Sequence, residues 1–271
     1  MLQTSVGQRH HLQVRGGTRK GNCAIVMGYG KLDYRMAPLP LSVIENHAAC
    51  LTFKGKKATM YIPAHFDESR TEVLHALIRQ HPFGMLVTHG AGGLDVNHIP
   101  FELHTDDGGL GVLRAHVARA NPVWQDVADG DEVLAVFRAA DAYVSPNWYP
   151  SKHAFHEQVP TWNYMVAHAH GRITIRDDER FVRGLVARLT RIHEATQAVP
   201  WKMTDSAAEF IDGKLKAIVG VEIEITRMEG KAKLSQNRAA ADISGAGTAL
   251  KAQGKDLLGE SMLAAARVRD E

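Results

Sequence analysis

Four polar side chains gather in the short segment LRAHVARANP, residues 113–122, in a pattern suited to holding an anion. Arg114, His116 and Arg119 cluster around the expected end of a strand, and Asn121 precedes a proline that turns the chain. A phosphate dianion accepts strong hydrogen bonds from arginine, and backbone amides at a turn add further donors. The segment therefore predicts either a phosphate-binding site or a solvated basic edge.

A second donor-rich run, KAKLSQNR at residues 231–238, follows a stretch that alternates cleanly between apolar and polar residues. Its donors include Lys233, Gln236 and Arg238. Such a run is typical of an exposed loop. It also suits a segment that reaches across a dimer interface to close a ligand site.

Two apolar stretches carry polar side chains where a core strand needs aliphatic ones. Thr161, Trp162 and Asn163 begin TWNYMVAHAH, and Asn97 and His98 interrupt the strand that ends in NHIPFEL. Aromatic rings stack on planar ligands, while hydroxyl and amide groups orient them. Both stretches therefore indicate either a wall of a ligand pocket or strands whose polar atoms bond to neighbouring loops.

The 15 histidines raise the question of a metal site. His168 and His170 alternate on one expected strand, so their rings point the same way, but no carboxylate or third ligand stands at a convincing spacing. We therefore expect no metal site. Dinucleotide, P-loop and nucleophile-elbow motifs are absent from the sequence. The segment after the helix expected near 181–194 is too long and proline-broken for a helix-turn-helix.

A mainly β architecture is expected to position these segments. Residues 83–145 lack the regular β-α alternation of a doubly wound sheet, and their short strands and tight turns favour a nearly closed antiparallel barrel. Two S-x-x-E capping boxes, at Ser69 and Ser206, predict helix starts, and Asp177 and Asp178 favour the positive N-terminal end of another helix. The patterns predict a hairpin over 83–103 and strands over 110–118, 132–139, 141–146, 162–175 (bent at Gly171) and 219–226. They predict helices over 69–80 and 177–195, a helix opening at 206, and a loop and helix after Arg238.

Composition is ordinary for a globular protein, with 45% hydrophobic and 23% charged residues among 271, and a net charge of +2. The charge is uneven, because residues 1–59 hold nine lysines or arginines and two acids, which leaves residues 60–271 at −5. We expect this basic head to be a poorly ordered extension, with a nucleic-acid-binding arm as the alternative.

The cellular setting is constrained only in outline by the sequence. No apolar run approaches the ~20 residues of a membrane-spanning helix. The two cysteines, Cys23 and Cys50, form no C-x-x-C pair. A reducing cytoplasm is therefore the expected location.

Seven segments, taken in order, resemble the PaiB family of bacterial proteins, described as FMN-binding negative transcriptional regulators. They are MYIPAHF, VTHGAGGLDVNHIPF, LRAHVARANPVW, AYVSPNWYPSK, VPTWNY, HAHGRI and IVGVEIEITRMEGKAKLSQNR. The resemblance spans Met60 to about Asp242. It implies a basic extension over 1–59, an FMN-binding split-barrel domain with helices over 60–242, and a C-terminal tail or helix over 243–271.

The resemblance implies a split β-barrel similar to the pyridoxamine-phosphate oxidase and flavin reductase-like proteins. In that fold FMN lies between two subunits, so a homodimer is implied. Trp162 and Asn163 would help to build the flavin pocket, and the segment from Arg114 to Asn121 would hold the phosphate. NHIP would lie along the flavin ring, and KLSQNR would come from the partner subunit. The Ser-Arg-Lys phosphate clamp of the oxidases is absent.

Three functions stay open on these observations. The first is an FMN-binding regulator, although no DNA-reading element is evident and the acidic net charge of residues 60–271 disfavours contact with a phosphate backbone. The second is an FMN-dependent oxidoreductase, in which His116, His168 or Tyr164 would transfer protons beside the flavin. The third is a barrel without a cofactor.

Overall fold

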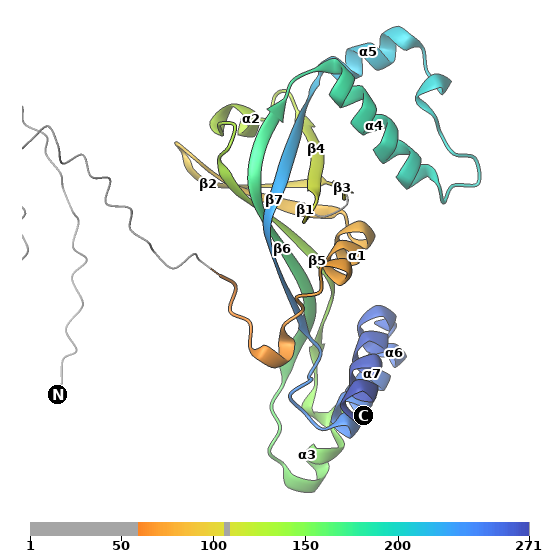
Figure 1. Ribbon diagram of the computed structural model, residues 1–271. Coiled ribbons are helices and arrows are strands. Elements are labelled where there is room, and N and C mark those ends of the chain that lie inside the picture. The colour runs from red at the N-terminus through yellow and green to blue at the C-terminus, as the bar shows by residue number, and fades with distance from the viewer. Residues whose placement is uncertain (1–58, 106–108, 271) are drawn as a thin grey trace, which may run out of the picture. The chain divides into compact units, whose positions relative to one another are not determined.

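An antiparallel sheet of seven strands forms the centre of the computed structural model (Figure 1). The structure describes residues 59–105 and 109–270, so the expectations for the basic head, its cysteines and most of the 105–109 turn lie outside the described residues. The strands are β1 (Phe83–Gly90), β2 (Gly93–Pro100), β3 (Glu102–His104), β4 (Val112–Ala118), β5 (Glu132–Val144), β6 (Thr161–Arg176) and β7 (Ile218–Lys233). Their order across the sheet is β2-β1-β5-β6-β7-β4-β3.

The sheet curls around one hydrophobic core. Leu86 of β1, Ile99 of β2, Leu113 of β4, Phe137 of β5 and Ile223 of β7 are all buried in this core. Because β2 at one edge and β4 near the other edge contribute to the same core, the sheet bends into a nearly closed barrel. The expected fold class, mainly β with flanking helices in a split barrel, is confirmed.

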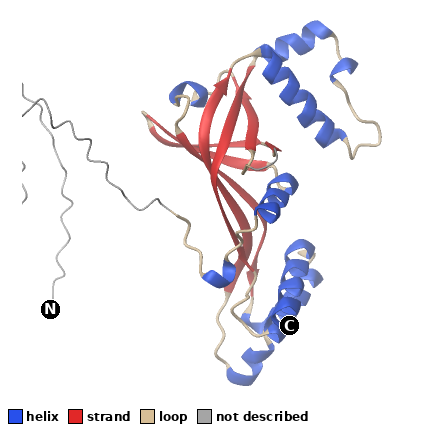
Figure 2. Cartoon of the chain, in the orientation of Figure 1, coloured by secondary structure: helices blue, strands red, loops and turns tan. Residues whose placement is uncertain are grey.

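Helices lie around the sheet rather than between its strands (Figure 2). Within the described residues, no helix combines the length and apolar character needed to cross a membrane. The α-helices are α1 (Thr71–Gln80), α2 (Val123–Asp126), α3 (Pro150–Phe155), α4 (Glu179–Glu194), α5 (Ala208–Lys216), α6 (Ala240–Ala252) and α7 (Asp256–Asp270), with short 3-10 turns at Ala64–Phe66, Pro146–Trp148 and Met203–Asp205.

Both predicted capping boxes are wrong by one residue. α1 is capped at Arg70 and α5 at Ala207, and neither cap makes a side-chain hydrogen bond. Ser69 and Ser206 each lie one residue too early for their hydroxyl groups to meet the N3 amide. In α4, by contrast, the side chain of Asp178 accepts a hydrogen bond from the amide of Phe181 at 2.7 Å, in agreement with the acidic start expected there.

The two strand runs expected over 132–146 form one strand, β5. Its pairing with β6 is irregular between Arg138 and Asp141, so the chain continues through the break that the sequence suggested. The expected bend at Gly171 coincides with a shift in the pairing of β6 with β7. An added Cβ at Gly171 would lie 2.4 Å from the carbonyl oxygen of Glu224, so only glycine fits there.

A β-bulge at Thr226 changes which residues of β7 face inward. His170 pairs with Arg227 and Gly171 pairs with Ile225, so Thr226 is the extra residue. Before the bulge the odd-numbered residues Val219, Val221, Ile223 and Ile225 are buried, as expected. After it, even-numbered residues take the inward positions: Met228 packs on the barrel core, and Ala232 packs on a second core.

The second core lies where β5, β6 and β7 extend towards α6 and α7. It contains Tyr149 with Ile243, Leu250, Leu258 and Met262, all fully shielded from solvent. Two helices follow Arg238 where one was expected, because Gly254 adopts a φ of 74° and turns the chain between α6 and α7. These helices pack against each other closely enough that an added Cβ at Gly247 would lie 3.0 Å from the carbonyl oxygen of Gly259.

Candidate functional site

Four arginines line a cavity of about 500 Å³ between α4 and the outer face of the sheet. Arg114 comes from β4, Arg176 from the end of β6, and Arg180 and Arg188 from α4. The cavity exists because α4 lies across this face: Phe181 packs on Gly220, where an added Cβ would meet the ring at 2.6 Å. We call this cavity and its four arginines the arginine pocket.

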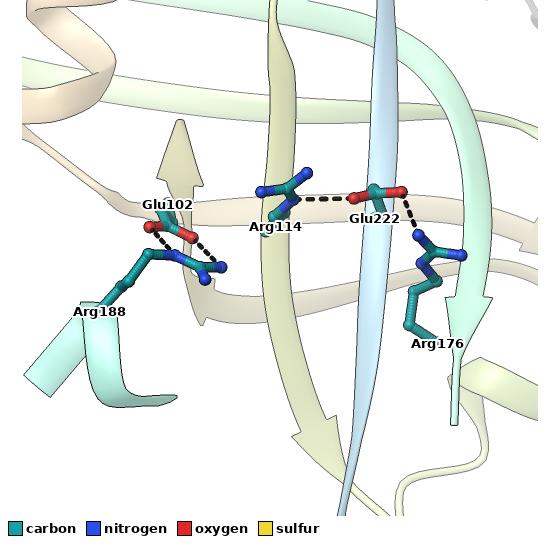
Figure 3. A network of polar contacts seen from close by, with 5 residues as sticks. All are labelled: Glu102, Arg114, Arg176, Arg188 and Glu222. Carbon is teal, nitrogen blue, oxygen red and sulfur yellow. Dashed lines mark hydrogen bonds and ion pairs between the residues drawn. The ribbon is translucent and has the colours of Figure 1, made fainter. Parts of the chain in front are cut away.

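One carboxylate serves two of these arginines (Figure 3). Glu222 of β7 accepts from Arg114 Nε at 2.8 Å through one oxygen, and its other oxygen lies 3.2 Å from Arg176 Nη2. Arg188 is held separately by Glu102 in a two-bond pair at 2.6 and 2.9 Å. Glu222 therefore fixes the guanidinium groups in place without occupying all their donors.

Two arginines of the pocket, Arg176 and Arg180, have donors without a protein partner among the described residues. The buried Nε of Arg176 has no hydrogen-bond partner. Among residues 59–105 and 109–270, no carboxylate pairs with the exposed side chain of Arg180. An incoming anion would thus meet positively charged groups that are already positioned.

His116 lies two residues along β4 from Arg114 and faces a neighbouring cavity under α4. This smaller cavity, of about 290 Å³, is also lined by His193, Glu194 and Trp201. Burial lowers the pKa of the His116 imidazole below its usual value, and its Nδ1 has no hydrogen-bond partner. His116 is therefore held mainly in its neutral form, with one ring nitrogen unused.

We expect His116 to make the protein less stable in mild acid. Its folded-state pKa lies below its unfolded value of about 6.5, so the unfolded chain binds a proton that the folded chain resists. The stability due to the neutral ring is fully present above this pH and is lost as the pH falls below it. Chemical denaturation of wild type and His116→Gln at pH 7.5 and 5 should show a smaller loss for the variant. The exposed His89→Gln serves as control, and an equal loss in wild type and His116→Gln would refute this prediction.

Arg119 and Asn121 make structural contacts outside the arginine pocket. Arg119 forms a two-bond ion pair with Asp177, at 2.8 and 2.5 Å, and also donates to the carbonyl oxygens of Lys216 and Ile218. Asn121 Nδ2 donates to Asn97 Oδ1 at 2.5 Å, which joins two of the predicted site residues. The donors of Arg119 are thus directed at protein groups.

His98 lies apart from this pair on the exposed side of β2. Its ring centroid is 6.5 Å from that of Phe83, in a tilted arrangement. This position places His98 on the outward face of the sheet together with Met85, its pairing partner on β1.

The start of β6 and the end of β7 bring together the second set of predicted residues. Lys233 Nζ donates to Thr161 Oγ1 and, at 2.6 Å, to the carbonyl oxygen of Trp162. Burial, followed by the charges of Lys231 and Arg238, lowers the pKa of the Lys233 ammonium group. Trp162 is 55% exposed, so an aromatic residue accessible to a ligand is in contact with this cation through its backbone.

Asn163, Gln236 and Arg238 complete this second group. Asn163 is fully buried: its Nδ2 donates to Ser235 Oγ at 2.9 Å, while its Oδ1 has no partner. Gln236 bonds to the backbone of Leu234 and Ala232. The Arg238 guanidinium stacks 4.3 Å from the ring centroid of Tyr149 and donates to Gln158.

The two groups lie far apart within one chain. Glu222, which holds Arg114, and Lys233 are eleven residues apart on β7, or about 35 Å at strand spacing. Sequence patterns predicted residues of both groups, but they did not predict the distance between the groups. Sequence reasoning also missed Arg176, Arg180 and Arg188, whose only signal was a series of arginines just before and along the helix expected over 177–195.

Comparisons with known proteins identify the family of this chain. Residues 60–227 match the family described as "Putative FMN-binding domain". An uncharacterised protein of Emericella nidulans is 33% identical over 221 residues, which cover 69% of this chain and 88% of its own. The protease synthase and sporulation protein PAI 2 of Bacillus subtilis is 29% identical over 179 residues, which cover 66% of this chain and 83% of the relative. A flavocytochrome of Azotobacter vinelandii superposes with a TM-score of 0.46 at 12% identity, over 62% of this chain and 69% of that one.

Proposed function

Because its residues 60–227 match the family of FMN-binding domains, the chain belongs to that family, and we propose that it holds the FMN phosphate in the arginine pocket. The observation that carries this proposal is the convergence of Arg114, Arg176 and Arg180 on one cavity. Bound FMN would supply redox chemistry, and the residues of this chain would bind and orient it.

The charge of the pocket suits a phosphate dianion. Four guanidinium groups line it against the carboxylates of Asp178 and Glu222, with Glu102 pairing Arg188 from outside the cavity. A phosphate monoester carries about −1.5 to −2 charge near neutral pH and presents three acceptor oxygens. Such a group would compensate the remaining positive charge and give the buried Nε of Arg176 a partner.

We further propose that the protein is a homodimer with FMN between its subunits. The separation of about 35 Å between the arginine pocket and the Lys233–Trp162 group supports this, because a single chain cannot direct both at one flavin. The outward face of β1 and β2 is also unusually apolar for a solvated surface, since Phe83, Leu94 and Val96 are 67%, 78% and 46% exposed. In the proposed homodimer a partner subunit covers this face, and it also supplies a second Lys233–Trp162 group.

We also propose that the protein acts in the regulation of gene expression. The name of the Bacillus subtilis relative associates that protein with protease synthesis and sporulation, which suits a flavoprotein that acts on gene expression in the cytoplasm. The alternative is an oxidoreductase that uses the same FMN. Steady oxidation of NADH or NADPH by the FMN-loaded protein would favour the oxidoreductase, whereas a DNA gel shift that persists at roughly 0.2 M salt would favour the regulator.

Thermal melting with FMN tests the binding itself. At 100 times its dissociation constant, FMN should add about 2.7 kcal/mol to the free energy of unfolding, or roughly 5–10 °C in melting temperature. Differential scanning calorimetry of the full chain, read alongside the flavin absorbance of the purified protein, measures this shift. A melting temperature unchanged by saturating FMN, in a protein without flavin absorbance, would overturn the proposal.

A further inference from the structure

Two histidines and one glutamate converge on the outer face of β6 and β7, apart from the arginine pocket. His168 and His170 alternate on β6, and Glu229 lies opposite His168 on β7. One donor atom from each residue lies within 4.8 Å of the donor atoms of the other two, and all three side chains are partly buried. The third ligand that the linear sequence lacked is thus supplied by strand pairing.

The donor set matches that of metal centres with open coordination positions. Two imidazoles and one carboxylate bind catalytic zinc, and the same set binds non-haem iron. Donor atoms at 2.0–2.2 Å from one ion are at most about 4.4 Å apart. A side-chain movement of less than about 1 Å would therefore bring all three donors onto one ion. We propose that His168, His170 and Glu229 form a binding site for a divalent transition-metal ion such as Zn²⁺.

The surroundings of Glu229 support a ligand role for one of its oxygens. Oε1 is held by Arg227, while Oε2 lies 3.2 Å from His170 Nε2 and 3.4 Å from the backbone amide of Met60. A carboxylate that binds a metal is commonly oriented by such an outer partner. Here Arg227 fixes the carboxylate by one oxygen and leaves the other directed at the imidazoles.

The neighbouring strand gives the cluster an apolar side. In the pairing of β5 with β6, Val136 lies opposite His168 and Leu134 lies opposite His170. Both apolar residues are partly buried and sit beside the imidazoles on this outer face. They shield one side of the cluster from water, which strengthens the attraction between the carboxylate and a bound cation.

Cobalt titration of the full chain tests the proposal, because Co²⁺ replaces Zn²⁺ and absorbs visible light when bound by imidazole and carboxylate. The test variants are His168→Gln/His170→Gln and, separately, the nearly isosteric Glu229→Gln. The control is His153→Gln/His156→Gln, which removes two exposed histidines at α3. Metal-free melting curves establish which variants are folded, and Zn²⁺ competition gives the affinities. Histidines elsewhere in the chain contribute equally to wild type and test variants, so a difference between these proteins reports binding at the cluster alone.

We expect wild type and control to bind one more tight equivalent of Co²⁺ than either test variant, or to bind it at least about 10-fold more tightly. Loss of an outer partner alone weakens metal binding 10- to 100-fold, so loss of a direct ligand should cost no less. Equal stoichiometry and affinity in wild type and folded Glu229→Gln would overturn the proposal. So would loss of the same equivalent in the control.

Discussion

Replacing Arg114 by glutamine should weaken FMN binding roughly 10- to 100-fold and leave riboflavin binding nearly unchanged. A hydrogen bond to a charged group contributes about 1.5–3 kcal/mol, and every 1.4 kcal/mol is tenfold in affinity. Riboflavin lacks the phosphate and should not respond to this change. Fluorescence titration of both flavins with wild type and variant measures the two ratios. Glu222 keeps Arg176 as a partner in this variant, so no unpaired buried carboxylate is created.

Arg119→Gln is the matched control for this experiment. Arg119 lies on the same segment and was an equal candidate from sequence, but its guanidinium is paired with Asp177. We expect the control to preserve the ratio of FMN to riboflavin affinity. An unchanged ratio in Arg114→Gln, or a larger change in Arg119→Gln, would show that the phosphate is bound elsewhere.

Truncating Phe137 to alanine should lower the free energy of unfolding by about 3–5 kcal/mol, as such substitutions do in well-packed cores. Phe137 is fully buried at the centre of the barrel, and its ring meets that of Phe101 edge-on at 5.3 Å. It also packs on Gly84, where an added Cβ would lie 2.8 Å from the ring. The melting temperature should fall by roughly 6–20 °C, measured by circular dichroism.

Tyr143→Ala on the same strand provides the comparison for this loss. Tyr143 is an aromatic residue of β5 beyond the irregular pairing, and it is 47% exposed. Its truncation removes less buried surface, so we expect a clearly smaller fall in melting temperature. Equal losses in the two variants would mean that the barrel core does not dominate the stability of the fold.

Local patterns predicted the elements well where one face of an element meets the core. The alternation of Val219, Val221 and Ile223 predicted a strand whose odd residues are buried, and they are. The acidic start of α4 was likewise visible in sequence, because a cap depends on residues three positions apart. The capping boxes at Ser69 and Ser206 failed because a four-residue motif does not determine at which residue the helix begins. Each helix begins one residue later than its motif requires.

The composition of the candidate sites depended on contacts between distant segments. Arg114 was noticeable from its own strand, but Arg176 joins it through the pairing of β4 and β6 with β7, and Arg188 joins it because α4 folds across the sheet. The histidine pair was visible and its carboxylate was not, since Glu229 stands 59 residues after His170. Strand pairing and its register, which the chain does not reveal locally, determine both groupings.

The extra residue at Thr226 makes the length of β7 as important as its composition. If Thr226 instead paired with His170, so that no residue bulged, Glu229 would pair with Ala167 and turn into the barrel core, and Met228 would turn towards solvent. Deleting Thr226 itself would leave Glu229 opposite His168, because the residue lost is the one that has no partner, whereas deleting Met228 would pair Glu229 with Ala169, bury a charge and dismantle the histidine–glutamate cluster. Evolution can exchange side chains along this strand, but a gap at one of its paired positions after the bulge would invert every position from the deletion to Lys233.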